Sequence, residues 1–135
     1  MFDPGVPLCT PGSNIVCYAF RPARTGATLG EMNALNKALY ERFSLHAGRR
    51  VYEQEFFVSR TSLSAKQYSP ATVGPFLERL GVSTADYERE GVFLLRSVLM
   101  NPWYAYAKRR GRYYLSELVE ALHTAAGEVV GAAAR

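Results

Sequence analysis

One arginine interrupts the most hydrophobic run of this sequence, and its chemistry suits the binding of an acid. The run, GVFLLRSVLM at residues 91–100, has the length and the β-branched content of a strand. Alternate residues of a strand share a face, so Arg96 lies in one stripe with Leu94 and Val98. Burial of an unpaired cation costs several kcal/mol, so the guanidinium must meet a carboxylate, a phosphate or a solvent-filled cleft. Its planar fork fits a carboxylate in bidentate geometry, which predicts a substrate-binding role for Arg96.

A structural role for Arg96 is the alternative interpretation. The arginine can lie at an edge position, or it can form an ion pair with an acidic residue such as Glu53 or Glu55. Structural ion pairs are more common than functional sites. The residue types alone leave both interpretations open.

A cluster of cations and tyrosines follows the predicted strand. Lys108-Arg109-Arg110-Gly111-Arg112 is flanked by Tyr104, Tyr106, Tyr113 and Tyr114. Proteins bind single-stranded nucleic acid with such combinations, because cations meet phosphates and aromatic rings stack on bases. A solvated basic turn, whose tyrosines pack on the core or on a partner, has the same composition. A free-standing module that binds nucleic acid or protein through segment 103–114 is therefore the alternative function.

No other residues form a recognisable catalytic or metal site, so we expect no catalytic residues in this chain. His46 and His123 lack metal-ligand neighbours, and His46 is placed to contact the last carbonyls of a helix. Ser59, Thr61 and Ser62 lack a nucleophile-elbow context. No phosphate-binding glycine motif is present. The cysteines, Cys9 and Cys17, have neither zinc nor redox spacing and are interpreted as reduced and structural.

Length and composition indicate one globular domain. The chain has 135 residues, 48% of them hydrophobic and 21% charged, with a net charge of +4. These values are ordinary for a folded domain and permit, but do not require, a nucleic-acid partner. Neither a membrane-spanning run nor a secretory signal is evident, so we expect a cytoplasmic protein without membrane contact.

Periodicity and turn residues predict an α+β fold, in which helices pack on one face of a small, mostly antiparallel sheet of three to four strands. Residues 1–13 are predicted to be a linker or strap, and 126–135 a frayed tail. Strands are predicted at 14–20, buried on both faces, at 56–63 with a neighbouring arm near Val51, and at 91–100. An amphipathic helix is predicted at 29–47, from a Thr28–Glu31 capping box to Gly48. Residues 64–90 are predicted to form a helical insertion, with one short helix that ends at Gly81 and another turn that starts at Ser83. A final helix is predicted after residue 112.

Two segments of the sequence resemble the C-terminal small domain of group II pyridoxal-phosphate-dependent amino-acid decarboxylases, which are fold-type-I enzymes. Residues 14–22, NIVCYAFRP, are similar to the strand that opens that domain. Residues 94–102, LLRSVLMNP, are similar to its late strand, in which an arginine precedes an Asn-Pro pair. The similarity in order and separation extends over residues 10 to 125.

The resemblance implies that this chain is one domain of a larger enzyme. The large domain of such enzymes holds pyridoxal 5'-phosphate, and the small domain closes over an amino-acid substrate. Arg96 matches the arginine that binds a substrate carboxylate in glutamate decarboxylases of the family. The Schiff-base lysine of the family follows a histidine, and Lys37, Lys66 and Lys108 do not. We therefore expect no cofactor in this chain alone and no activity of the isolated domain. The resemblance also implies a homodimeric parent enzyme, in which residues 14–125 form the small domain.

Overall fold

A three-stranded antiparallel sheet forms the centre of the molecule. The computed structural model describes residues 14–46 and 50–134, so the predicted linker at 1–13 lies outside it. Strand β3 (Val92–Val98) lies between β1 (Ile15–Tyr18) and β2 (Ser59–Leu63) and is antiparallel to both. The predicted α+β class with a small antiparallel sheet is confirmed, and the hydrophobic run at 91–100 supplies the central strand.

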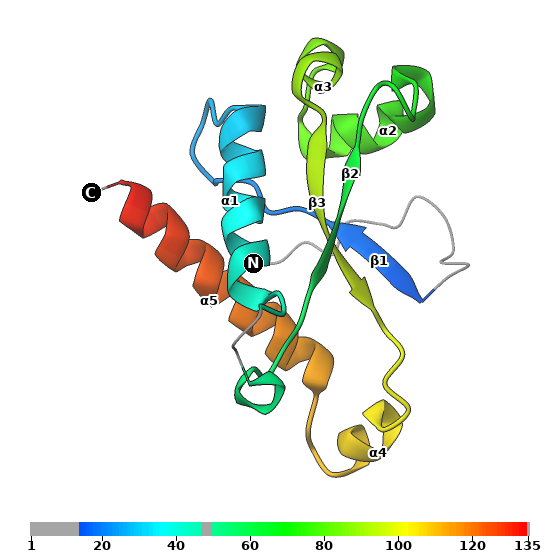
Figure 1. Cartoon of the computed structure of the whole chain (residues 1–135), viewed down its shortest axis with the longest axis vertical. Helices are drawn as coiled ribbons and strands as arrows, with labels where there is room; N and C mark the ends of the chain where they lie inside the picture. The colour runs from blue at the N-terminus through cyan, green and yellow to red at the C-terminus, as the bar shows by residue number, and fades with distance from the viewer. Residues whose placement is uncertain (1–13, 47–49, 135) are drawn as a thin grey trace.

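Helices α1 (Leu29–Phe43) and α5 (Tyr114–Ala133) cover one face of the sheet (Figure 1). The odd-numbered residues of β3 point toward these helices, as the alternation of a strand requires. Phe93 and Leu95 pack there against side chains of both helices. The other buried residues of this cluster are Leu35, Leu39, Val58, Leu122, Ala125 and Ala126. Helix α5 therefore continues past residue 125 to Ala133, and Ala126, the first residue of the predicted tail, is buried.

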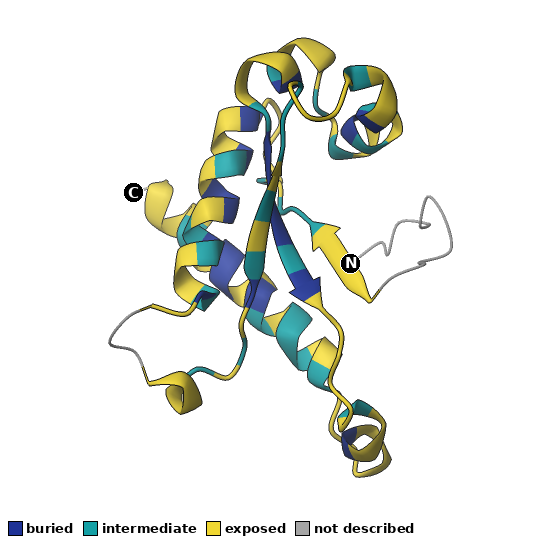
Figure 2. Cartoon of the chain, turned by 45° about the vertical axis from the view of Figure 1, so that its right-hand side comes forward, coloured by how far each residue is buried: buried dark blue, intermediate teal, exposed yellow. Residues whose placement is uncertain are grey.

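The predicted insertion at 64–90 folds into two short helices that cover part of the opposite face. These are α2 (Pro70–Leu80) and α3 (Thr84–Glu90). They pack on the even-numbered residues Val92 and Leu94 of β3, and the fully buried Tyr87 lies at their centre. The cover ends there, because Val98 on the same face is 48% exposed. Figure 2 shows this change along β3 from buried to exposed.

Two strand predictions were wrong. Residues 14–20 were predicted to be buried on both faces, but Ile15, Val16 and Cys17 are exposed. β1 is an edge strand that pairs with β3 alone, so its apolar composition does not report double burial. The strand expected near Val51 is a 3-10 turn, Val51–Glu53. This turn and its following residues lead into β2, which starts at Ser59 rather than at residue 56.

The start of α1 confirms the predicted capping box. The Glu31 backbone N–H donates to the Thr28 hydroxyl at 3.2 Å, and the Thr28 backbone N–H donates to the Glu31 carboxylate at 2.8 Å. The helix ends at Phe43, four residues before the predicted end, and Gly48 lies outside the described residues. His46 lies beyond this end with Nε2 at 2.6 Å from the Glu41 carbonyl oxygen, which confirms its predicted contact with the last carbonyls.

Two asparagines of α1 form hydrogen bonds with the backbone of adjacent segments, at the start of β3 and just after β1. Asn33 accepts from the Phe93 backbone N–H at 2.9 Å and donates to the Gly91 carbonyl at 3.0 Å. The fully buried Asn36 accepts from the Phe20 N–H and donates to the Phe20 carbonyl, both at 2.8 Å. The Asn36 amide also donates to the Met32 carbonyl at 2.8 Å. These bonds join α1 to the sheet and to the segment that follows β1.

Replacement of Asn36 by alanine should destabilise the domain strongly. The change leaves the Phe20 N–H and carbonyl without a partner, and each unsatisfied buried group costs about 1–3 kcal/mol. We expect the free energy of unfolding, measured by urea denaturation, to fall by about 3 kcal/mol. Lys37→Ala, at the adjacent exposed position, is the control and should change it by less than about 0.5 kcal/mol. Equal stability of the two variants would contradict this role of Asn36.

Candidate functional site

Arg96 lies at the centre of a row of three side chains that crosses the sheet. Opposite residues of paired strands share a face, and Arg96 lies opposite Cys17 of β1 and Ser59 of β2. This row comes directly after Leu94, which is buried under the insertion, and directly before the exposed Val98. Arg96 itself is half-buried. The guanidinium therefore lies where the covered half of this face meets the open half.

The Arg96 guanidinium has a serine rather than an acid as its partner. Its Nε donates to the Ser59 Oγ at 2.9 Å, and the Ser59 hydroxyl donates to the Arg96 carbonyl at 3.0 Å. Within residues 14–46 and 50–134, no carboxylate lies within ion-pair distance of Arg96. The two terminal nitrogens of the fork, with four N–H groups, are thus available to a ligand.

Among the described residues, the ion-pair alternative for Arg96 is not found, and both suggested acids pair elsewhere. Glu55 binds Arg112 at 3.0 Å, and Glu53 lies 4.0 Å from Arg50. The alternative of an edge position is also wrong, since β3 is the central strand. The structure therefore agrees with neither structural alternative. Arg96 is a cation on the central strand that faces a partly open surface.

Apolar side chains extend from Arg96 over the open half of this face. Ile15 lies opposite Val98 in the next row, and each side chain is 48% exposed. Met100, just beyond the end of β3, is 69% exposed. We call Ile15, Cys17 and Val98 the open sheet face. Exposed apolar residues that adjoin one another on a sheet are typical of an interaction surface.

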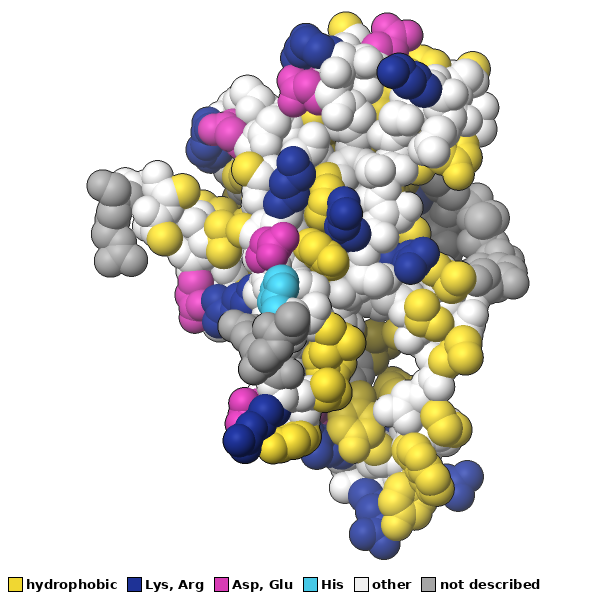
Figure 3. Space-filling model, viewed as in Figure 1, with side chains coloured by type: hydrophobic (Ala, Val, Ile, Leu, Met, Phe, Trp, Pro, Cys, Tyr) yellow, Lys and Arg dark blue, Asp and Glu magenta, His cyan; other side chains and the backbone are white. Residues whose placement is uncertain are grey.

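The predicted basic aromatic segment projects from one end of the molecule as helix α4 (Tyr104–Arg109) and the turn after it (Figure 1). Trp103 is 68% exposed and packs edge-to-face on Tyr106. Arg110 lies over the Tyr106 ring, 4.9 Å from its centroid. Arg112 forms ion pairs with Glu55 and Glu117, which neutralise part of the charge. Figure 3 shows hydrophobic side chains gathered at this end, so the segment is as apolar as it is basic.

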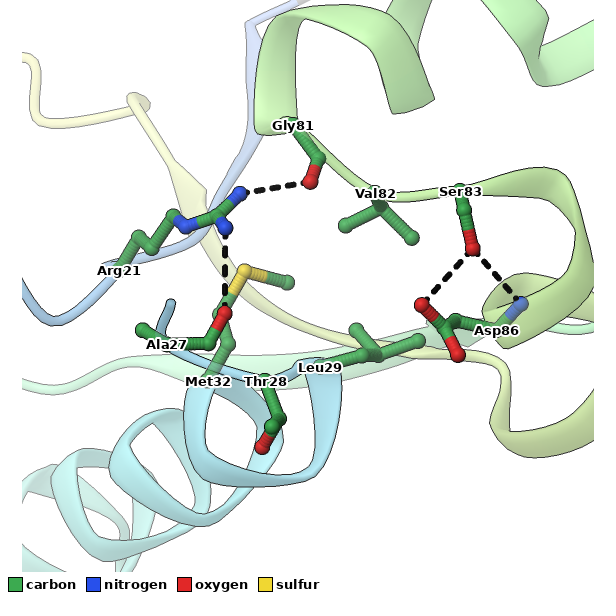
Figure 4. A pocket seen from close by; sticks show the side chains of 9 residues that line it. All are labelled: Arg21, Ala27, Thr28, Leu29, Met32, Gly81, Val82, Ser83 and Asp86. Atoms are coloured by element: carbon green, nitrogen blue, oxygen red, sulfur yellow. Dashed lines mark hydrogen bonds between the residues drawn. The ribbon is translucent and has the colours of Figure 1, made fainter. Parts of the chain in front are cut away.

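A second arginine, Arg21, lines a small cavity between the starts of α1 and α3 (Figure 4). The Arg21 guanidinium donates to the carbonyls of Leu80, Gly81 and Ala27. Its donors thus join the turn after α2 to the start of α1. The nearby carboxylates belong to the first turns of helices: hydrogen bonds from Thr28 lower the pKa of Glu31, and one from the Ser83 hydroxyl lowers the pKa of Asp86. We interpret this cavity as structural.

The described residues contain no other arrangement that favours catalysis. No group of three potential metal ligands was found among them, and none of their helices is long and apolar enough to cross a membrane. Cys17 is a free, exposed thiol, and Cys9 lies outside the described residues. His123 packs edge-to-face on Phe20. Lys37, Lys66 and Lys108 are all exposed.

The sequence alone suggests Ser59 only as a possible nucleophile and does not connect it with Arg96. The two residues are 37 positions apart, and only the register of β2 against β3 brings them together. A signal was present, because Ser59 shares its strand parity with Thr61 and Leu63, opposite Leu94 and Val92. That signal could be used only once the strand pairing was known.

Comparison with known proteins identifies the class of this domain. Residues 5–125 match the family model described as the C-terminal domain of tyrosine decarboxylase. Because this match covers most of the chain, the chain belongs to that family. It is 29% identical over 125 residues to the L-tyrosine decarboxylase of Enterococcus faecium. The alignment covers 92% of this chain but 20% of that enzyme, so the chain spans about a fifth of its relative's length.

Replacement of Gly81 by alanine tests the structural role of Arg21. Gly81 has a φ of +65°, and a Cβ there would overlap the Arg21 Nη1. We expect the free energy of unfolding to fall by about 2 kcal/mol, from left-handed strain and the loss of Arg21 contacts. Gly74→Ala is the control, because a Cβ at that helical position meets no atom within 4 Å. It should raise stability by about 0.5–1 kcal/mol, and a similar gain for Gly81→Ala would contradict the interpretation.

Proposed function

We propose that this chain is the substrate-closing domain of a pyridoxal-phosphate-dependent L-amino-acid decarboxylase, and that Arg96 binds the substrate carboxylate. The observation that carries the proposal is the position of the Arg96 guanidinium. It lies at the border of an open apolar face, and its terminal nitrogens have no acidic partner among the described residues. Membership of the tyrosine decarboxylase family supports the reaction class.

L-Tyrosine is the proposed substrate, because the relative from Enterococcus faecium is named for it. Its single carboxylate is also the group that leaves as carbon dioxide. A bidentate contact from Arg96 would bind this carboxylate and fix the direction of the bond to be broken. Leu94 and Val98, which flank Arg96 along the strand, provide an apolar setting in which the charge-assisted hydrogen bonds are stronger than in water.

The cofactor does not fit within this chain and belongs to the proposed large domain. Covalent attachment of pyridoxal phosphate needs a lysine amine in the active site. The chain's lysines, Lys37, Lys66 and Lys108, are exposed and lie outside the row that contains Arg96. When bound in the large domain, the cofactor supplies an electron sink for the decarboxylation. The part of this chain is to bind and orient the substrate and to exclude water.

The open sheet face is the proposed contact with the large domain. It adjoins Arg96 on the open half of the sheet, so a domain that covers it would bring substrate and guanidinium together. About four fifths of the relative's length lies outside the matched region, which is ample for such a domain. A homodimeric enzyme in the cytoplasm remains part of this proposal.

A free-standing binding module built on segment 103–114 is the alternative. The exposed Trp103 and Tyr106 beside Arg110 favour a partner at this end of the molecule. A nucleic-acid partner would require affinity that falls steeply with salt and with neutralisation of Lys108, Arg109, Arg110 and Arg112. The ion pairs of Arg112 with Glu55 and Glu117 leave less free charge for phosphate than the sequence suggested.

Arg96→Gln in the complete decarboxylase should impair substrate binding. Loss of a charge-assisted contact of this kind corresponds to about a 10- to 100-fold fall in kcat/KM for L-tyrosine, mainly through a higher KM. Steady-state release of carbon dioxide measures it, and the absorption spectrum of the bound cofactor should not change. The control is Arg60→Gln, because Arg60 lies over the Tyr40 and Phe93 rings on the helix-covered face. If both variants retained normal KM values, the role of Arg96 would be excluded.

The isolated domain should self-associate and bind a hydrophobic dye through the open sheet face. Val98→Lys places a charge at its centre, so we expect weaker dye fluorescence and a shift toward monomer in sedimentation velocity. Val130→Lys is the matched control, because Val130 is also exposed, at 39%, but lies on α5. A monomeric, dye-free wild-type domain would contradict the assignment of this face.

A further inference from the structure

We propose that Ser59 is a positioning residue that holds Arg96 ready for an end-on contact with the substrate carboxylate. This inference rests on the proposed function of Arg96 and adds a second residue to the site. It depends on a reciprocal pair of hydrogen bonds between strands β2 and β3.

Both hydrogen bonds of the Ser59 hydroxyl go to Arg96. Ser59 Oγ accepts from the Arg96 Nε at 2.9 Å and donates to the Arg96 carbonyl oxygen at 3.0 Å. Because the two residues lie directly opposite each other in the sheet, the backbone of both strands fixes the position of the hydroxyl. The first torsions of a flexible arginine are thereby restrained before any substrate arrives.

The contact also determines which edge of the guanidinium a ligand can use. A carboxylate can bind arginine side-on, through Nε and one terminal nitrogen, or end-on, through both terminal nitrogens. Ser59 occupies the Nε–H, so the side-on geometry is blocked. The two terminal nitrogens remain, which directs the carboxylate to the end of the fork.

This restraint is useful because, among the described residues, the structure shows no other hydrogen bond of the Arg96 side chain. Cys17, opposite on β1, and Leu94 and Val98, along the strand, offer no strong acceptor. An acidic partner in place of Ser59 would hold the side chain equally well, but it would neutralise the charge that the substrate needs. A serine orients the guanidinium, which lowers the entropy cost of substrate binding. Because the serine is neutral, it also leaves the positive charge of Arg96 available to the substrate carboxylate.

The test compares Ser59→Ala with Ser59→Thr in the complete decarboxylase. Alanine removes the hydroxyl, whereas threonine retains it and suits a strand. We expect Ser59→Ala to raise the KM for L-tyrosine about 3- to 10-fold with kcat little changed, and Ser59→Thr to restore most of the affinity. Ser62→Ala, on the opposite face of the same strand and facing away from Arg96, is the matched control and should behave as the wild type.

Two inhibitors separate positioning from a general structural effect. 3-(4-Hydroxyphenyl)propanoate has the carboxylate of L-tyrosine without its amine, and tyramine has the amine without the carboxylate. Ser59→Ala should weaken inhibition by the first about 3- to 10-fold and leave inhibition by tyramine unchanged. In the Ser59→Ala, Arg96→Gln double variant the loss should equal that of Arg96→Gln alone, because Ser59 acts through Arg96.

The outcomes distinguish this inference from the proposed function. If Arg96→Gln weakens the carboxylate inhibitor but Ser59→Ala does not, the positioning role is overturned while the carboxylate site stands. If Ser59→Ala weakens both inhibitors equally, its effect is structural and the inference is also overturned. If Arg96→Gln changes neither inhibitor, both the carboxylate site and the role of Ser59 are excluded.

Discussion

Two asparagine side chains of α1 supply hydrogen bonds that the short strand β1 leaves unmade. β1 pairs only with residues 95–98 of β3, so the first part of the central strand has no strand neighbour on that side among the residues that the structure describes. Asn33 binds Gly91 and Phe93 there, and Asn36 binds both backbone groups of Phe20, where the chain leaves the sheet. Buried backbone groups without partners are costly, so these amides determine where α1 lies.

The two faces of the sheet are covered unequally, and this difference creates the candidate site. α1 and α5 cover one face, whereas the insertion covers the other only as far as Leu94. The same strand therefore contributes to the core at one end and carries an accessible cation at the other. Arg96 escapes the full desolvation cost of a buried charge, yet its neighbours restrict the surrounding water. An unpaired guanidinium is stable at such a border and would be costly a few residues earlier.

Local signals in the sequence predicted much of the fold correctly. The capping box at Thr28 and Glu31, the helix that ends at Gly81 and the start at Ser83 all depend on contacts within a few residues. Such contacts are specified by adjacent residues and need no knowledge of the fold. The burial of β1 was mispredicted because an apolar edge strand and an apolar central strand have the same composition. Only the pairing order distinguishes them.

The sequence by itself determined which residue has the chemistry of an acid-binding site, because a lone arginine in an apolar strand is evident from residue types and alternation. It also determined the starts of α1, α3 and α5 and the strand at 91–100, but not helix α4, which lies in the segment expected to be a basic turn. Only the tertiary structure decided what surrounds Arg96: Ser59 rather than Glu53 or Glu55, with an open apolar face beside it. The physical reason is that strand register joins residues far apart in the chain. A shift of one residue would turn Ser59 to the opposite face, so its contact with Arg96 is a property of the folded sheet.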